Sequence, residues 1–226
     1  MRSIVFDTGP IITLATNDLL FVLPELKKKF NGDFFIADSV RMELVDRPHE
    51  SRMFKLESIM VDKLISDGII KVHEKLNVES LLSDVNKIYS VNGTPLHILD
   101  RAEIEALSLA LKLQAEVYVL DERTLRMLIE DPKALRKILE RKLHRDVDFN
   151  KKLADEFLNI VRGIKVVRSS ELMVVAYELG LLNHFINARH DSADFLDALL
   201  WGLRLRGCGI STQEIDRIIE FEGKNK

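Results

Sequence analysis

The chain has 226 residues, of which 46% are hydrophobic and 31% are charged, a composition that is typical of a globular protein with one large domain or one domain plus a sizeable insertion. Its single cysteine, Cys208, excludes an internal disulfide and a cysteine-based zinc site, and no apolar run approaches the roughly 18 residues of a membrane span, so we expect a cytoplasmic protein without a membrane partner. The net charge of −3 and the pI of about 6.1 exclude a molecule that is cationic overall, so a nucleic-acid partner would need a local basic patch.

Short apolar runs alternate with longer helical patterns along the chain. The runs that we expect to form strands are 3–7, 33–37, 68–73, 116–120 and 163–168. The segments that we expect to form helices are 10–30, 39–46, 53–67, 79–90, 100–114, 124–160, 170–183, 193–206 and 211–222. This alternation predicts an α/β fold with a parallel sheet and helices on both faces.

Within this fold we expect one domain over 1–226, with two additions to a smaller core. Residues 126–160 are highly charged and predict a helical insertion, in which Pro132 follows the expected N-cap Asp131. Residues 170–226 predict a set of C-terminal helices.

Two aspartates follow directly on predicted strands. Asp7 ends the first strand, and Asp121 ends the fourth. In an open parallel sheet the ligand crevice lies beyond the carboxyl ends of the strands, so both carboxylates are expected at one functional edge. A carboxylate at the end of an apolar strand is costly unless something pairs with it.

The helix expected over 99–114 carries two glutamates with different predicted environments. On a helical wheel Glu103 falls within the apolar arc, whereas Glu105 falls on the opposite side with Ser108 and Lys112. We therefore expect Glu103 to be buried and Glu105 to face solvent. The alternative for Glu103 is a first-turn acid that interacts with the helix dipole or caps a neighbour.

Carboxylates gathered at one buried edge repel one another unless a divalent cation neutralises them. An all-oxygen set of ligands favours Mg²⁺ or Mn²⁺ over zinc. The sequence thus predicts that Asp7, Asp121 and Glu103 form a metal site, with Glu43 as a weaker candidate because its helix is short and it flanks the apolar stripe.

Four motifs together resemble the PIN-domain nucleases, in particular their VapC-like branch. The motifs are IVFDTGPIITLA, ADSVRMEL, DRAEIEALSLAL and VYVLDERTLR. The tail from 162 to 222 is similar to an uncharacterised prokaryotic PIN-like family. The resemblance implies a three-layer fold with a central, mostly parallel five-stranded sheet.

The resemblance also implies a chemistry and a set of residues. The activity would be that of a Mg²⁺- or Mn²⁺-dependent ribonuclease that hydrolyses RNA phosphodiester bonds, in some relatives the toxin of a toxin–antitoxin pair, with an antitoxin protein and a second copy of the chain as further partners. The metal-binding and catalytic acids would be Asp7, Glu43, Glu103 and Asp121, supported by Thr8 and Glu122. The alternative is a catalytically degenerate PIN-like domain that acts as an RNA-binding or protein-interaction module.

An RNA substrate needs a cationic surface near the acids, because phosphates dominate the affinity. The candidates are Arg123, Arg126, Lys133, Lys137 and Arg141. The alternative is a solvated helix face with pairs such as Arg136 and Glu140 at i,i+4 spacing. The scarcity of glutamine beside abundant Lys and Glu is typical of a heat-adapted, archaeal or thermophile-like source.

Overall fold

A five-stranded sheet, in which all strands are parallel, forms the centre of the molecule. The computed structural model describes residues 2–186 and 191–224. The strand order is β3-β2-β1-β6-β8, and each neighbouring pair is parallel. The strands are β1 (Ser3–Phe6), β2 (Asp33–Ile36), β3 (Ile70–Val72), β6 (Val117–Val119) and β8 (Val166–Val167). All five predicted strands are present, each shortened at one or both ends.

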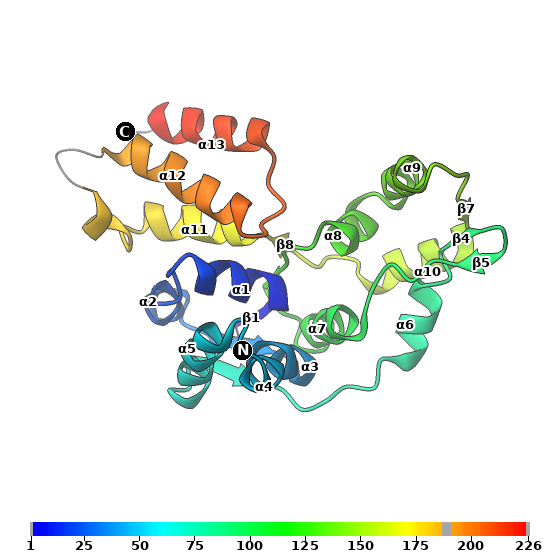
Figure 1. Cartoon of the computed structure of the whole chain (residues 1–226), viewed down its shortest axis with the longest axis horizontal. Coiled ribbons are helices and arrows are strands. Elements are labelled where there is room, and N and C mark those ends of the chain that lie inside the picture. Colours follow the sequence, from blue (N-terminus) through cyan, green and yellow to red (C-terminus); the bar gives the residue numbers. More distant parts are fainter. Residues whose placement is uncertain (1, 187–190, 225–226) are drawn as a thin grey trace.

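Helices cover both faces of this sheet, which confirms the expected three-layer α/β fold. Figure 1 shows α2 and α5 on one side of the sheet and α7 on the other. This agrees with the right-handed rule for crossover connections. The connections β1→β2 and β2→β3 lead toward one edge of the sheet and the connection β3→β6 leads back toward the other edge, so their helices lie on opposite faces. The helices of this core are α1 (Thr8–Thr16), α2 (Val22–Phe30), α3 (Asp38–Arg41), the π-helix η1 (Met42–Asp46), α4 (Arg47–Glu50), α5 (Lys55–Ser66) and α7 (Arg101–Lys112).

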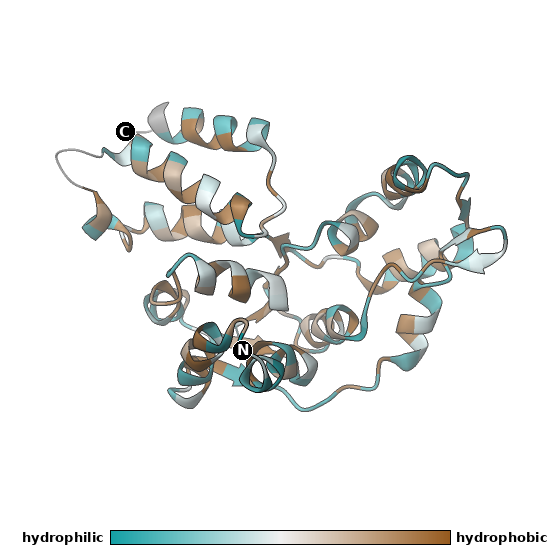
Figure 2. Ribbon diagram, in the orientation of Figure 1, coloured by the Kyte–Doolittle hydropathy of each residue, from teal (hydrophilic) through white to brown (hydrophobic). Residues whose placement is uncertain are grey.

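The apolar side chains gather between these layers. Val5, Phe6, Ile104 and Leu107 are fully buried, and Figure 2 shows hydrophobic and hydrophilic stretches alternating along the helices. The predicted helix 10–30 is broken into α1 and α2, because Asp18 adopts a left-handed conformation in the turn between them.

A separate lobe, which we call the arm, projects from the core at the right of Figure 1. Its elements are α6 (Glu79–Val85), β4 (Tyr89–Val91), β5 (Thr94–Pro95), α8 (Arg123–Glu130), α9 (Pro132–Leu143), β7 (Asp148–Phe149) and α10 (Lys151–Ile160). Pairing of β4 with both β5 and β7 joins the two parts of the chain. The ring of the buried Tyr89 packs against that of Phe149 in a tilted arrangement, and its hydroxyl donates a hydrogen bond of 2.7 Å to the Pro132 carbonyl.

The arm therefore uses more of the chain than the predicted insertion 126–160. The predicted helix 79–90 is wrong at its end, because the chain leaves the helix after Val85 and forms a β-hairpin. Asn92 and Gly93 both have positive φ angles in the hairpin turn, the conformation that an Asn-Gly pair favours. The predicted helix 124–160 is likewise broken, first at Asp131–Pro132 and again by β7.

The C-terminal helices lie beside the core, at the upper left of Figure 1. They are α11 (Ser169–Glu178), the short 3₁₀ helix η2 (Asn183–Phe185), α12 (Ser192–Leu205) and α13 (Thr212–Lys224). Residues 187–190 and 225–226 of the expected region 170–226 lie outside the described residues. Across the described ranges, no helix combines the length and the apolar character that a membrane crossing requires.

Candidate metal and nucleic-acid site

Asp7 is delivered to the carboxyl edge of the sheet by the buried strand β1. Its backbone N–H still bonds the Val119 carbonyl at 3.0 Å, and its backbone forms the N-cap of α1. Its side chain is buried with 3% exposure, and its Oδ1 atom finds no hydrogen-bond donor among the described residues. A buried, unsatisfied carboxylate oxygen is costly and demands a physical explanation.

The surroundings of Asp7 disfavour its charged form. Burial, followed by repulsion from Asp100 and Glu43, raises its pKa to about 7, although the backbone N–H groups of Thr8 and Gly9 oppose the rise. Burial and repulsion from Asp100, Glu122 and Asp7 likewise raise the pKa of Glu103 to about 8. The acids from β1, η1, α7 and α8 therefore act on one another electrostatically at one edge of the sheet.

Glu103 and Glu105 do not lie as the helical wheel predicts. Glu103 is half-buried in the first turn of α7, where it forms a capping box with Asp100: the Asp100 N–H donates to Glu103 at 2.7 Å, and the Glu103 N–H donates to Asp100 at 3.0 Å. Glu105, predicted to face solvent, is 1% exposed and accepts a hydrogen bond of 2.8 Å from the Leu76 N–H. The prediction for Glu105 is wrong because α3, α6 and the segment before α6 cover this side of α7 as well.

Glu43 reaches the same edge from the π-helix η1. The Thr8 hydroxyl donates to its Oε2 at 2.9 Å, and Arg47 pairs with its Oε1 at 3.1 Å. A π-helical turn is rare and is frequent at functional sites, and here it carries Glu43 toward α1. Thr8 thus orients Glu43, one of the acids that the sequence predicts for the site.

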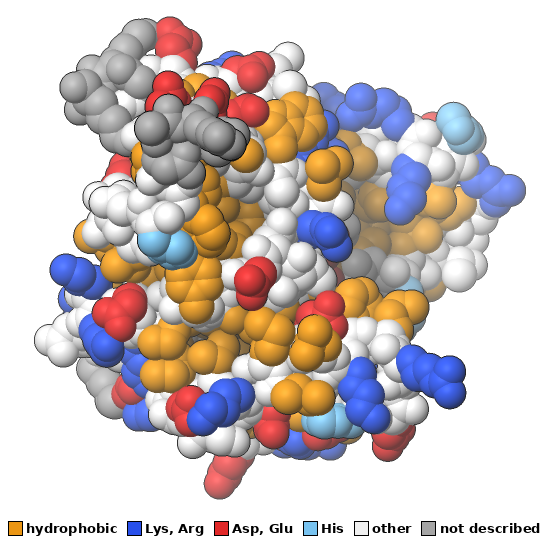
Figure 3. Space-filling model, turned by 60° about the vertical axis from the view of Figure 1, so that its left-hand side comes forward, with side chains coloured by type: hydrophobic (Ala, Val, Ile, Leu, Met, Phe, Trp, Pro, Cys, Tyr) orange, Lys and Arg blue, Asp and Glu red, His pale blue; other side chains and the backbone are white. Residues whose placement is uncertain are grey.

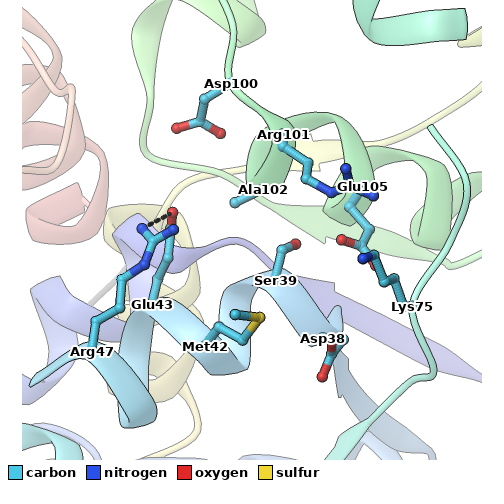
Figure 4. A pocket seen from close by; sticks show the side chains of 10 residues that line it. All are labelled: Asp38, Ser39, Met42, Glu43, Arg47, Lys75, Asp100, Arg101, Ala102 and Glu105. Carbon is cyan, nitrogen blue, oxygen red and sulfur yellow. Dashed lines mark hydrogen bonds and ion pairs between the residues drawn. The ribbon is translucent and has the colours of Figure 1, made fainter. Parts of the chain in front are cut away.

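A cavity of about 390 Å³ opens between the α3–η1–α4 segment and the start of α7. Figure 4 shows Asp100 and Glu43 on facing walls, with Ala102 and Ser39 between them. The cavity is lined by Asp38, Ser39, Met42, Glu43, Arg47, Lys75, Asp100, Arg101, Ala102 and Glu105. Four of these residues are acidic and three are cationic, and Arg47 pairs with Glu43, so the cavity presents both charges.

Asp121 lies close to Asp7 in space, and its carboxylate is hydrogen-bonded to Ser169. A Cβ atom at Gly9 would lie 3.4 Å from the Asp121 Cβ and 3.9 Å from the Asp7 Oδ2, so both acids flank Gly9. The Asp121 carboxylate accepts hydrogen bonds of 2.7 Å from both the N–H and the hydroxyl of Ser169. Glu122 caps α8 by accepting from the Leu125 N–H at 2.6 Å.

Within the described residues, no three His, Cys, Asp or Glu side chains already lie in an arrangement that could hold a metal ion. The acids nevertheless fit a divalent cation chemically. A carboxylate cluster whose charge is not neutralised has raised pKa values, because each acid disfavours the ionisation of the others. Asp7 and Glu103 both have raised pKa values, and the Oδ1 atom of Asp7 has no donor among the described residues. A hard cation with oxygen ligands would remove both costs.

Sequence reasoning missed three residues at this edge. Asp100 had a signal, because an Asp three residues before Glu103 is a capping-box pattern. Tyr118 and Ser169 had none, since each is a tertiary neighbour of an acid. Burial, and then the charges of Asp7 and Glu103 among others, raise the pKa of the Tyr118 hydroxyl well above its usual value.

The predicted RNA-binding cations divide into two groups. Arg126 donates to the Gly209 carbonyl at 3.3 Å, which ties α8 to the C-terminal helices. Arg123 is exposed just beyond the acidic edge, and Lys133, Lys137 and Arg141 are exposed along α9 of the arm. Figure 3 shows Lys and Arg side chains gathered on the arm, at the right of that view.

Comparison with known families agrees with this architecture. The model of a family described as PIN domain matches residues 3–131, which is more than half of the chain. No curated protein and no solved structure matches. PIN domains are in general nucleases that use divalent metal ions and act on RNA. This chain belongs to the PIN-domain family.

Proposed function

We propose that this protein is a Mg²⁺- or Mn²⁺-dependent endoribonuclease. The observation that carries the proposal is the buried Asp7, whose Oδ1 lacks a donor among the described residues and whose pKa is raised to about 7 by burial and by neighbouring acids. Asp7 and Glu103 would hold the cation, with Glu43 and Asp121 as further ligands. The bound cation would serve as the Lewis acid for phosphodiester hydrolysis.

The protein's own residues have defined tasks in this proposal. Thr8 fixes Glu43 by a hydrogen bond of 2.9 Å, and the capping box fixes Glu103 at the start of α7. The burial of Asp7 and Tyr118 excludes water from the inner side of the site. Arg47, Lys75 and Arg101 border the adjoining cavity, where they would bind RNA phosphates.

The direct test is cleavage of mixed single-stranded and structured RNAs by the purified protein. We expect cleavage with Mn²⁺, none with EDTA, and a loss of at least a hundredfold for Glu103→Gln, because the amide removes a charged ligand. Cleavage that is equal in wild type and variant, or that survives EDTA, would contradict the proposal.

A second function is favoured by the spacing of the acids. Because the described residues contain no ready group of three metal-binding side chains, and Glu103 and Glu122 are bonded to backbone N–H groups, a degenerate domain that binds RNA without cleaving it is the alternative. RNA binding by wild type without cleavage at any Mn²⁺ or Mg²⁺ concentration would favour this alternative.

We expect the arm to contribute to RNA affinity through Lys133 and Lys137. Replacing both by alanine should weaken binding of single-stranded RNA and lower the slope of log K against log salt by about 1.4, if each contacts one phosphate. The matched control is Lys28→Ala with Lys29→Ala, an exposed pair on α2. Fluorescence anisotropy at several salt concentrations measures the RNA affinity and its salt dependence. Equal slopes for the two double variants would show that Lys133 and Lys137 of the arm do not contact RNA phosphates.

A further inference from the structure

Among the described residues, the carboxylate of Asp121 accepts hydrogen bonds from Ser169. The N–H of Ser169 donates to Oδ1 and its hydroxyl donates to Oδ2, each at 2.7 Å. Asp121 is 3% exposed and Ser169 is fully buried. Two short bonds from one residue to both oxygens fix the side-chain rotamer of the acid as well as its position.

The backbone supplies half of this contact. Ser169 is the first residue of the ten-residue helix α11, and the N–H groups of a first helical turn have no partner within the helix. Their dipole favours a negative charge. The chain thus places a helix start, with an added hydroxyl, directly against a strand-end carboxylate.

The C-terminal helices anchor Ser169 through the residue before it. Arg168 is buried with 6% exposure, pairs with Glu214 of α13 at 2.8 Å and donates to the Gly209 carbonyl at 3.0 Å. It also pairs with Glu171 in the first turn of α11. This network determines where α11 begins, and therefore where the Ser169 donors lie.

We infer that Ser169 is a positioning residue for the metal site. It holds Asp121 in one orientation beside Gly9 and Asp7, and the C-terminal helices set that orientation through Arg168. Ser169 does not touch reacting atoms, so its effect acts through Asp121. The inference rests on the proposed metal-dependent function.

The test compares Mn²⁺ affinity, measured by titration calorimetry, in wild type and single variants. Ser169→Ala should bind Mn²⁺ about tenfold more weakly, the usual effect of losing a residue that orients a metal ligand. Ser169→Cys keeps the shape of the side chain but replaces the hydroxyl by a larger thiol that is a weaker donor, and it should lose affinity similarly, whereas Ser169→Thr keeps the hydroxyl and should retain the affinity.

Ser170→Ala is the matched control. Ser170 is equally buried in the same helical turn, and within the described part of the chain its hydroxyl makes no hydrogen bond to an acid, so its removal should leave Mn²⁺ affinity unchanged. If Ser169→Ala and Ser169→Cys bind Mn²⁺ with wild-type affinity, the inference about Ser169 is wrong, but the proposed function is not affected. A wild type that binds no Mn²⁺ would overturn the proposed function, and the inference with it.

Discussion

Replacing Asp7 by asparagine should lower the rate of Mn²⁺-dependent RNA cleavage by about a thousandfold, which corresponds to about 4 kcal/mol of transition-state stabilisation. The amide keeps the shape of the side chain but loses the charge that would bind the cation. The same change should not weaken the metal-free fold, because the carboxylate is desolvated and its Oδ1 lacks a partner among the described residues. Cleavage assays and thermal unfolding in EDTA measure the two effects.

Asp33 provides a matched control for this experiment. It is a buried aspartate in the same sheet, at the opposite end of the neighbouring strand β2, and it is paired with Lys71 at 2.8 Å and Lys27 at 3.5 Å. Asp33→Asn should leave cleavage near the wild-type rate and destabilise the fold by about 1 kcal/mol, because the half-exposed Lys71 loses its partner while Lys27 keeps its hydrogen bonds to the Gly68 and Ile69 carbonyls. If both variants lose stability and activity together, the role assigned to Asp7 is wrong.

The core of the fold could be predicted because local and tertiary signals agree there. Each strand of the central sheet is a short apolar run bounded by polar residues, and such runs are buried on both faces of a parallel sheet. The arm could not be assigned because its two halves, 79–98 and 123–160, meet only in three dimensions. One local signal was available: Asn92–Gly93 is a hairpin turn pair, and it marks the end of the expected helix 79–90.

The residues of the candidate site that lie at the end of a strand or at the start of a helix could be predicted from the sequence. Asp7 lies at the edge where the sheet topology puts it, and Glu103 lies in the first turn of its helix. The helical wheel failed for Glu105 because it assumes one buried face, whereas the chain packs against α7 on more than one side. The Ser169 contact of Asp121 joins positions 48 residues apart, and no spacing within the sequence encodes it.

The metal-free protein should become less stable as the pH rises from about 4 to about 8. The pKa of Asp7 is raised to about 7 and that of Glu103 to about 8, chiefly by burial, while both acids ionise near pH 4 in the unfolded chain. Between these values the folded state binds more protons than the unfolded state, so the free energy of unfolding falls with increasing pH. We expect each acid to contribute a loss of about 1.4 kcal/mol per pH unit between its unfolded-state and folded-state pKa, seen as a progressive fall in Tm.

The double variant Asp7→Asn with Glu103→Gln isolates this effect, because it keeps every histidine and every other acid of the wild type. Its Tm should change little over the same pH range, whereas the wild-type Tm should fall. Saturating Mn²⁺ should reverse the wild-type trend, since metal binding requires the deprotonated acids and therefore strengthens as the pH rises. Parallel pH profiles for the wild type and the double variant, with and without Mn²⁺, would show that the fold does not raise the pKa values of Asp7 and Glu103 and that the two acids do not share a cation.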